Sequence, residues 1–443
     1  MASIRCDALI LGGGFAGLSC ASALAEKGAR PVVLEKKPHL GGRAFSFKDP
    51  ESGEIVDNGQ HLFMGCYRQT RRFLERIGSS ELLSFAQRIR VDFADVNGRR
   101  DALVCPTAFG SPAHFALGIM GLRGLSLSDK WGLVRLDRAL RRMQRRGVSA
   151  ELDKMTVRDW LGSLGQSRRI QQRLFDPIAL GALNDDPGVA AATGFAQVLL
   201  EIFFNDTASS RFGLSRVGLS ELYTEQAKDY VEKRGGSVRL SAKAAELLYE
   251  GSRVAGVRLE GGEELRAERV VSTLPPWDLA KLGLKGAWEG LKPAPIVSVS
   301  LWLDRPVLSS EEDFIGLLGT ETQWAFNKTK IFSKNGGGQV VALVLSGAHK
   351  HIGRDPKTLK AIVENDLAAC IPRFREAKIL RWKVVKEPFA TLSPVPGSDA
   401  LRPASDAGPE GLLFAGDWTQ TRLPATIESA CVSGHAAAER VLG

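Results

Sequence analysis

The sequence predicts an α/β fold in which a domain built on a parallel sheet joins a second domain of mixed sheet plus helices. Three observations predict it. A glycine-rich turn follows an apolar strand at residues 6–11, and a second apolar strand at residues 31–34 ends in an acidic residue. The chain of 443 residues is also too long for one simple core, so we expect two closely joined domains.

The glycine-rich turn has the pattern of a dinucleotide-binding site, with Gly12, Gly14 and Gly17 in the expected places. Gly12 permits the tight turn, Gly14 lets a pyrophosphate approach the backbone, and Gly17 lets the helix pack against the strand. Glu35 follows the second strand, where an acid accepts hydrogen bonds from a ribose hydroxyl. Glycine-rich turns alone are common, but this complete order of elements predicts a Rossmann-type domain.

The middle of the chain combines a hairpin, a long helical region and short strands. Residues 90–104 predict a hairpin with Asn97-Gly98 at its turn. Residues 112–234 are mostly helical by periodicity, with breaks expected at Asp176-Pro177 and at residues 186–188. Strands are predicted at residues 238–240, 245–249, 254–260, 264–266 and 270–273.

The last third predicts a second sheet and a closing helix. Alternating residues from 297 to 302 indicate a half-exposed strand. Further strands are expected at residues 323–332, 339–346, 379–386 and 411–415, and helices at residues 356–371 and 424–442.

The composition is that of an ordinary globular protein, with 44% hydrophobic and 25% charged residues. No apolar run is long enough to span a bilayer, and the first strand leaves no room for a signal peptide. The six cysteines show no paired spacing, which favours reduced thiols in the cytoplasm. No Cys/His cluster has zinc-site spacing, so we expect no metal.

Positive charge is concentrated between Met120 and Gly147, where eight Lys/Arg residues face two Asp residues. An apolar stripe and a basic face alternate at helical spacing: Leu133, Leu136, Leu140 and Met143 against Arg135, Arg138, Arg142 and Arg145. Two interpretations stay open: a solvated charged face over an ordinary core stripe, or a surface attracted to anionic membrane lipids. No nucleic-acid-binding module is present, so we expect no nucleic-acid partner.

Three further motifs, together with Glu35, carry a resemblance to a known superfamily: Gly41-Gly42-Arg43, Leu274-Pro275-Pro276 and Ala415-Gly416-Asp417. In this order and spacing, the chain resembles the flavin amine oxidase and phytoene desaturase superfamily over essentially its whole length. The resemblance implies a discontinuous FAD-binding domain at residues 1–85, 225–290 and 396–443. Residues 86–224 and 291–395 would then form the substrate-binding domain.

Shorter motifs resemble one branch of this superfamily more closely, the squalene-associated hydroxysqualene dehydroxylases. These motifs are residues 57–61, 182–184, 417–419 and 423–428. The resemblance implies reductive dehydroxylation of hydroxysqualene to squalene, with hydride from N5 of reduced FAD. It also implies a long-chain isoprenoid alcohol as substrate, an unidentified electron donor, and synthases of the squalene pathway as upstream partners.

The resemblance also implies a set of cofactor-binding positions. The Arg43 guanidinium suits a pyrophosphate or flavin carbonyl, and Ala244 would meet the adenine edge through its backbone. Asp417 would hold the ribityl chain or pyrophosphate, and helix N–H groups near Thr426 and Ile427 would stabilise reduced flavin. The remaining expected positions are Phe15, Ala16, Lys36, Gly42, Gly59, Gln60, His61 and Gly416.

The proton donor is left open between His61 and Asp57, and His61 is equally well explained as a cofactor contact. No tethering Cys or His is apparent, so we expect non-covalent FAD. No tyrosine pair suggests a cage for a cationic amine, although Trp418 is a candidate cover for part of the flavin. Candidate walls of an apolar substrate tunnel lie at helical spacing at Phe195, Leu199, Phe203 and Phe204.

Three other functions remain alternatives at this point. A carotenoid-type or phytoene-type desaturase would run hydride toward the flavin, and an amine oxidase is a weaker alternative because of the missing cage. A non-catalytic FAD-binding protein that presents isoprenoids to another enzyme belongs to a different class.

Overall fold

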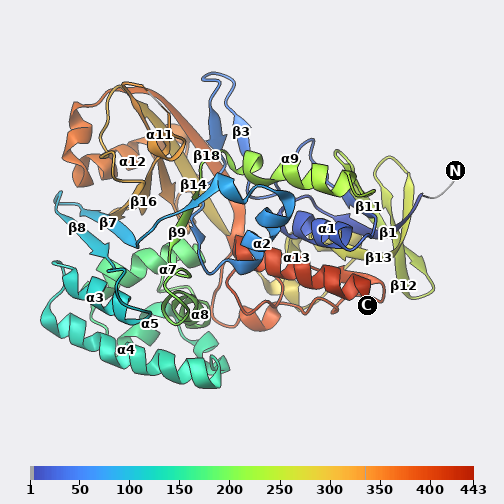
Figure 1. Cartoon of the computed structure of the whole chain (residues 1–443), viewed down its shortest axis with the longest axis horizontal. Helices are drawn as coiled ribbons and strands as arrows, with labels where there is room; N and C mark the ends of the chain where they lie inside the picture. The colour runs from blue at the N-terminus through green and yellow to red at the C-terminus, as the bar shows by residue number, and fades with distance from the viewer. Residues whose placement is uncertain (1–3, 335) are drawn as a thin grey trace.

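The structure is a computed structural model, and it describes residues 4–334 and 336–443. Two large sheets lie toward opposite ends of the molecule, and a group of helices lies beside the second sheet (Figure 1). The predicted fold class is thereby confirmed, because one sheet is mainly parallel and the other is mixed.

Seven strands form the first sheet, and five of them are mutually parallel. In order these are β10 (Ser237–Arg239), β2 (Pro31–Leu34), β1 (Ile4–Leu11), β13 (Glu264–Ser272) and β19 (Leu412–Phe414). The hairpin of β11 (Ala244–Glu250) and β12 (Arg253–Leu259) extends the sheet antiparallel to β13. The second half of β1, from Ala8 to Leu11, is entirely apolar because both faces of the strand are covered there.

Three helices cover one face of this sheet: α1 (Phe15–Glu26), α9 (Leu219–Glu232) and α13 (Ile427–Leu442). The helices α1 and α13 approach closely, since a Cβ atom at Gly434 would lie 2.2 Å from the carbonyl oxygen of Ala16. Only glycine therefore fits at this crossing, which joins the beginning of the chain to a helix near residue 430.

The second sheet has the order β18, β14, β17, β16, β15, β7 and β8, with only β15 and β7 parallel. The bounds are β7 (Arg90–Asp95), β8 (Arg100–Val104), β14 (Pro293–Leu303), β15 (Phe314–Leu318), β16 (Trp324–Asn327), β17 (Gln339–Leu345) and β18 (Ile379–Leu392). The helix α12 (Pro356–Cys370) covers one face, and the helical region packs on the other.

The remaining helices belong to the helical region beside the second sheet and to shorter connecting segments (Figure 1). The helices are α2 (Arg68–Ile77), α3 (Ala113–Gly121), α4 (Leu127–Arg146), α5 (Val157–Ser163), α6 (Arg168–Ile170), α7 (Asp176–Leu183), α8 (Ala192–Phe203), α10 (Pro276–Leu279) and α11 (Lys328–Ile331). Two small sheets pair β3 (Ser46–Lys48) with β4 (Ile55–Asp57), and β9 (Phe212–Ser215) with both β5 (Phe63–Met64) and β6 (Leu83–Phe85).

Four details differ from the sequence predictions. The break predicted at Asp176-Pro177 is wrong, because the chain stays helical there: a π-helical turn at residues 171–175 passes directly into α7. The strands predicted at 264–266 and 270–273 are one strand, β13. The strand β14 is not half-exposed, because α12 and the helical region cover its two faces. The strand predicted at 323–332 turns into α11 after Asn327, whose side chain caps that helix.

The strands of the first sheet come from residues 4–34, 237–272 and 412–414, and those of the second from residues 90–104 and 293–392. The domain boundaries at residues 85, 225, 290 and 396 stay a prediction.

Candidate active site

One cavity of about 950 Å³ extends from the glycine turn of the first sheet to the second sheet and the helical region. Its first part is lined by the turn after β1, by the segment around Glu35 and Arg43, and by the start of α13. Its second part is mainly apolar, and its walls include Val91, Phe93, Leu103, Phe115, Ile178, Ile202, Phe212, Trp324 and Phe326. The cavity therefore places a polar end next to an apolar chamber.

The glycine turn has the geometry that a dinucleotide needs. Gly12 has a φ of +110°, which favours glycine, and its N–H donates to the Leu34 carbonyl at 2.8 Å. A Cβ at Gly17 would lie 1.9 Å from the Gly12 carbonyl oxygen, so helix and strand meet only because position 17 has no side chain. At Gly14 an added Cβ would lie at ordinary contact distance, 3.7 Å or more, from the backbone of Gly41 and Gly42. All three glycines line the cavity, so a pyrophosphate would meet their backbone without a side chain in between.

Glu35 is held rigidly at the end of β2. Its two carboxylate oxygens accept from the backbone N–H groups of Gly13 at 2.8 Å and Lys37 at 2.9 Å. Each oxygen keeps a further lone pair, and the side chain lines the cavity. The carboxylate is therefore positioned to accept from a ribose.

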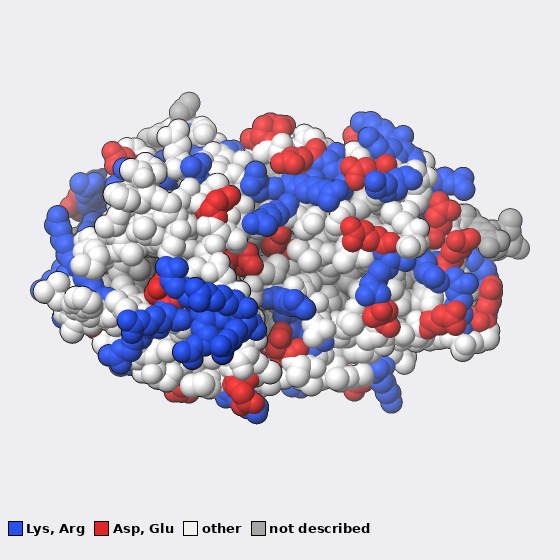
Figure 2. Space-filling model, turned by 60° about the horizontal axis from the view of Figure 1, so that its bottom comes forward, with Lys and Arg blue, Asp and Glu red and all other residues white. Residues whose placement is uncertain are grey.

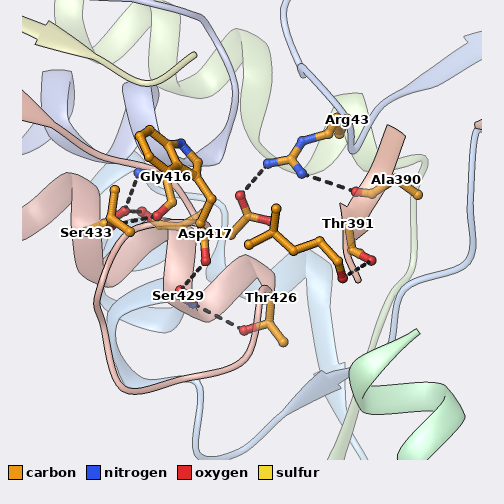
Figure 3. A network of polar contacts seen from close by, with 12 residues as sticks. Arg43, Ala390, Thr391, Gly416, Asp417, Thr426, Ser429 and Ser433 are labelled. Atoms are coloured by element: carbon orange, nitrogen blue, oxygen red, sulfur yellow. Dashed lines mark hydrogen bonds and ion pairs between the residues drawn. The ribbon is translucent and has the colours of Figure 1, made fainter. Parts of the chain in front are cut away.

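A polar network closes the opposite side of the cavity (Figure 3). The Arg43 guanidinium forms an ion pair with Asp417 and donates to the Ala390 carbonyl at 3.3 Å. Ser429 of α13 donates to the Asp417 carbonyl, and the Gly416 N–H donates to Ser433 of the same helix. These contacts fix the loop after β19 against the start of α13.

The helix α13 begins at the cavity. Its N-cap residue Thr426 accepts from the Ser429 N–H at 3.2 Å. Within the described part of the chain, no acceptor lies within hydrogen-bond distance of the N–H groups of Ile427 and Glu428. These free donors and the positive end of the helix dipole favour an anionic or carbonyl group in the cavity.

The described residues therefore fit FAD. One cavity is lined by the backbone of Gly14, by Glu35 with its free lone pairs, by the Arg43–Asp417 pair and by the start of α13 with its unpartnered N–H groups. When bound, FAD would meet these groups with its pyrophosphate, ribose and flavin carbonyls, each of which accepts or donates the matching hydrogen bonds.

The predicted proton donors His61 and Asp57 have different surroundings, although they are close in sequence. Asp57 lies off the cavity wall, where its carboxylate pairs with Lys328 at 2.8 Å and accepts from the Leu219 N–H at 3.1 Å. His61 lines the cavity, and burial lowers its pKa to about 4, with Asp57 opposing this shift and Lys328 adding to it. The imidazole is thus neutral at physiological pH and is no cationic acid.

Most of the other predicted cofactor-binding residues line the cavity. They are Gly12, Gly14, Phe15, Ala16, Glu35, Lys36, Gly42, Arg43, Gln60, Ala244, Gly416, Asp417, Thr426 and Ile427. Gly17 and Gly59 lie behind the wall: Gly17 supports the helix crossing, and Gly59 lies against the His61 ring. Their roles toward FAD itself stay a prediction.

Two expectations about aromatic residues are corrected. Trp418 does not cover the cavity, because it is buried in the core against Trp288 and Phe414. On α8, Phe195 and Leu199 belong to the helical core, and the face with Val198, Glu201 and Ile202 lines the cavity instead. Phe203 lines the cavity as expected, whereas Phe204 packs against the core.

The sequence analysis missed two residues that hold the site together. Arg402 donates to the carbonyl oxygens of Asp417, Thr419 and Leu423, and so fixes the loop before α13. Asn184 joins the helical region to the second sheet, since its amide donates to Ala294 and Thr391 and accepts from the Gly347 N–H. Asn184 lies in the 182–184 motif, but only its φ of +54° at the end of α7 explains the residue type.

Within residues 4–334 and 336–443, no group of three or more His, Cys, Asp or Glu side chains has a metal-binding arrangement.

Residues 15–442 match the model of the family described as flavin-containing amine oxidoreductase. The chain belongs to this family. Membership, together with a cavity that fits the cofactor, makes the protein an FAD-dependent oxidoreductase.

Relatives within and around the family differ in activity. The chain is 27% identical to hydroxysqualene dehydroxylase of Sinorhizobium fredii over 448 residues, covering 98% of this chain and 97% of that protein. It is 24% identical to 15-cis-phytoene desaturase of Synechococcus elongatus over 469 residues, covering 98% and 95%. Among solved structures, putrescine oxidase bound to putrescine has a TM-score of 0.75 at 15% identity, with both chains fully covered, and this likeness concerns the fold alone.

Proposed function

We propose that this family member removes the hydroxyl group of hydroxysqualene and replaces it with hydride, giving squalene. The single observation that carries the proposal is the cavity, which joins the FAD-binding groups directly to a deep apolar chamber. Such a chamber suits a long isoprenoid and is poorly suited to a small cationic amine. The hydroxysqualene dehydroxylases that the chain resembles act, by their name, on this substrate class.

The protein's part in this reaction is orientation and the exclusion of water. The allylic carbon–oxygen bond breaks, the oxygen leaves as water, and the cation needs a hydride before solvent recaptures it. Reduced FAD, when bound, supplies that hydride from N5. The apolar walls exclude water around the cation, and the start of α13 stabilises negative charge on the cofactor.

The experiment that tests this proposal is anaerobic incubation of photoreduced protein with hydroxysqualene. We expect flavin reoxidation together with squalene, and one deuterium at the former carbinol carbon when N5 of the flavin carries the label. Reoxidation without squalene would contradict the proposal. The physiological electron donor would replace photoreduction in the cell, and squalene-pathway synthases would supply the substrate.

The second candidate function is desaturation of a carotenoid precursor. It is favoured by the phytoene desaturases, which are 22–25% identical to this chain over 98% of its length. Here hydride would pass to oxidised flavin. Conjugated double bonds formed from phytoene by oxidised protein, with bleaching of the flavin, would support this candidate and contradict the first.

The FAD is proposed to be non-covalent. We expect no covalent bond between the flavin and any of the free cysteines. Acid precipitation should therefore release the yellow cofactor into the supernatant. Colour that stays in the pellet would contradict this.

We further propose that the protein lies in the cytoplasm and attaches to the inner face of the cytoplasmic membrane through α4. Figure 2 shows a broad basic patch on this side of the molecule. The arginines of the patch are exposed, whereas Leu136 and Leu140 are buried beneath them. Beside the patch, large apolar side chains are exposed at Phe109, Leu117, Met120, Leu127, Trp131 and Val134.

The combination of positive charge and exposed apolar side chains on α4 favours membrane attachment over the alternative, a charged helix face that only contacts solvent. Trp131 is 74% exposed and Leu127 is 72% exposed, which is costly in water but favourable in the acyl region of a bilayer. Arginines beside them would meet anionic headgroups. In the part of the chain that the structure describes, no helix has the length and apolarity to cross a membrane.

A further inference from the structure

The helix α8 presents a single carboxylate to the apolar chamber. Glu201 lines the cavity between Val198 and Ile202 of the same helical face. The opposite face, with Phe195 and Leu199, is buried in the helical core, so the helix cannot rotate Glu201 out of the cavity. The other residues that α8 contributes to the cavity wall, Val198, Ile202 and Phe203, are apolar, so Glu201 is the polar group that this helix places there.

The Glu201 carboxyl is oriented by two neutral amides. Gln197 donates to Oε1 at 3.1 Å, and Asn205 donates to Oε2 at 2.9 Å. Asn205 is itself anchored by its second contact, to the Glu201 carbonyl at 3.0 Å. Among the described residues, no Lys, Arg or His forms an ion pair with Glu201.

Glu201 shares its cavity with the start of α13. Glu201, Cys66 and Tyr67 line this cavity together with Thr426 and Ile427. Tyr67 hydrogen-bonds to Thr426, the N-cap residue of α13. Burial raises the pKa of the Cys66 thiol to about 12, and the carboxyls of Glu201 and Glu428 add to this shift, so both lie within electrostatic range of Cys66.

The other acidic groups near this point are already engaged. Glu428 accepts from the N–H groups of Gln69 and Thr70 and from the Thr70 hydroxyl, all within 2.9 Å. Asp57 is ion-paired off the cavity wall, and His61 is neutral. Glu387 of β18 also lines the cavity. Among the described carboxyl groups of the cavity wall, that of Glu201 is the one held by two neutral side-chain amides.

We propose that Glu201 is the catalytic acid that protonates the departing hydroxyl group of the isoprenoid alcohol. The inference rests on the proposed dehydroxylation. The Glu201 carboxylic acid gives its proton to the hydroxyl oxygen, the carbon–oxygen bond breaks, and water leaves. The cation takes a hydride from reduced flavin, the two-electron donor, and the Glu201 carboxylate regains a proton from solvent.

The test compares Glu201→Gln with its parent and with Glu225→Gln, which changes an exposed glutamate on α9. Photoreduced proteins are mixed with hydroxysqualene, and flavin reoxidation is followed in a single turnover. We expect Glu201→Gln to slow this step by about 10²- to 10⁴-fold, with Glu225→Gln unchanged. FAD content and the perturbation of the oxidised flavin spectrum by hydroxysqualene should stay at the parent's values.

A second substrate separates proton donation from positioning. The acetate ester of hydroxysqualene carries a leaving group that needs less protonation, so Glu201→Gln should recover most of its lost rate on the ester. Equal losses on alcohol and ester, or an unchanged rate on the alcohol, overturn this inference alone. A parent that forms no squalene overturns the proposed function and the inference with it.

Discussion

Gly14 and Gly17 lie three residues apart in one turn, yet each is glycine for a different reason. An alanine at position 17 would overlap the Gly12 carbonyl, whereas one at position 14 has at least 3.7 Å of room within the protein. Gly17→Ala should therefore destabilise the fold by about 3 kcal/mol or more. Gly14→Val should fold but lose FAD, because its side chain fills the space for the pyrophosphate.

Thermal denaturation and the ratio of flavin to protein absorbance measure these two effects separately. Full FAD occupancy in Gly14→Val would contradict the interpretation of the turn as a pyrophosphate site.

His61 should make the folded protein less stable in acid. Its pKa is about 4 in the folded protein and about 6.5 when unfolded, so between these values the unfolded chain binds a proton that the folded protein does not. Stability should fall as the pH falls from 6.5 to 4, by up to about 3 kcal/mol, with no contribution from His61 above pH 6.5.

Replacing His61 with Asn should remove this part of the pH dependence. Urea denaturation midpoints of parent and variant at pH 7 and pH 4.5 measure it. A variant with the same loss of stability in acid as its parent would show that the imidazole titrates freely.

At the residue scale, the sequence predicted backbone roles better than side-chain roles. The glycine spacing and Glu35 were predictable because strand, turn and helix follow directly along the chain. The different surroundings of Asp57 and His61 could not be predicted. They depend on contacts of Asp57 with Lys328 and Leu219, which are distant in the sequence. Glu201 was missed because the aromatic stripe on the opposite face of α8 gave the stronger pattern.

At the element scale, the end of α7 is a joint between the helical region and the second sheet. Asn184 has a left-handed backbone and three hydrogen bonds to segments near residues 294, 347 and 391. Asn184→Ala should cost about 2–4 kcal/mol, the sum of backbone strain and lost hydrogen bonds to buried groups.

Asn184→Gly is the matched variant, because it removes the amide and keeps the left-handed backbone free of strain. It should be about 1 kcal/mol more stable than the alanine variant in chemical denaturation. Equal stability of the two variants would mean that the backbone conformation contributes nothing.

Elements with local signals were predictable, and those that depend on distant partners were not. The hairpin of β7 and β8 follows from Asn97-Gly98, whose glycine has the expected positive φ of +72°. The sheet of β5, β9 and β6 was missed because its strands have two to four residues and pair across more than 100 positions. The strand β9 was also missed because it lies within the region predicted to be helical and its sequence shows no alternation of apolar and polar residues.

At the scale of the whole molecule, the basic patch on α4 should determine membrane binding. Each arginine near anionic headgroups contributes about 1 kcal/mol. Replacing Arg138, Arg142, Arg145 and Arg146 with Gln should weaken binding to anionic vesicles by more than about 100-fold at low salt. Arg141 is left in place because it pairs with Asp137 and lies over Phe204.

A matched variant changes four exposed cations elsewhere on the surface: Lys350, Lys357, Arg373 and Arg375. It should bind anionic vesicles like the parent, and all proteins should bind neutral phosphatidylcholine poorly. Cosedimentation measures both, with FAD content unchanged throughout. If the two variants lose binding equally, net charge rather than the patch is responsible.

The close crossing of α1 and α13 has a consequence for the order of events during synthesis. The helix α1 leaves the ribosome about 400 residues before α13, the helix against which Ala16 must pack and whose N-terminus completes the flavin end of the cavity. The strand β19, which pairs with β13 in the first sheet, is also synthesised late. Until α13 is synthesised, the nucleotide site of the nascent chain is incomplete and the apolar surface of α1 is uncovered. Cofactor capture is a late step of its maturation, and shielding by a chaperone during that interval should raise the yield of holoprotein.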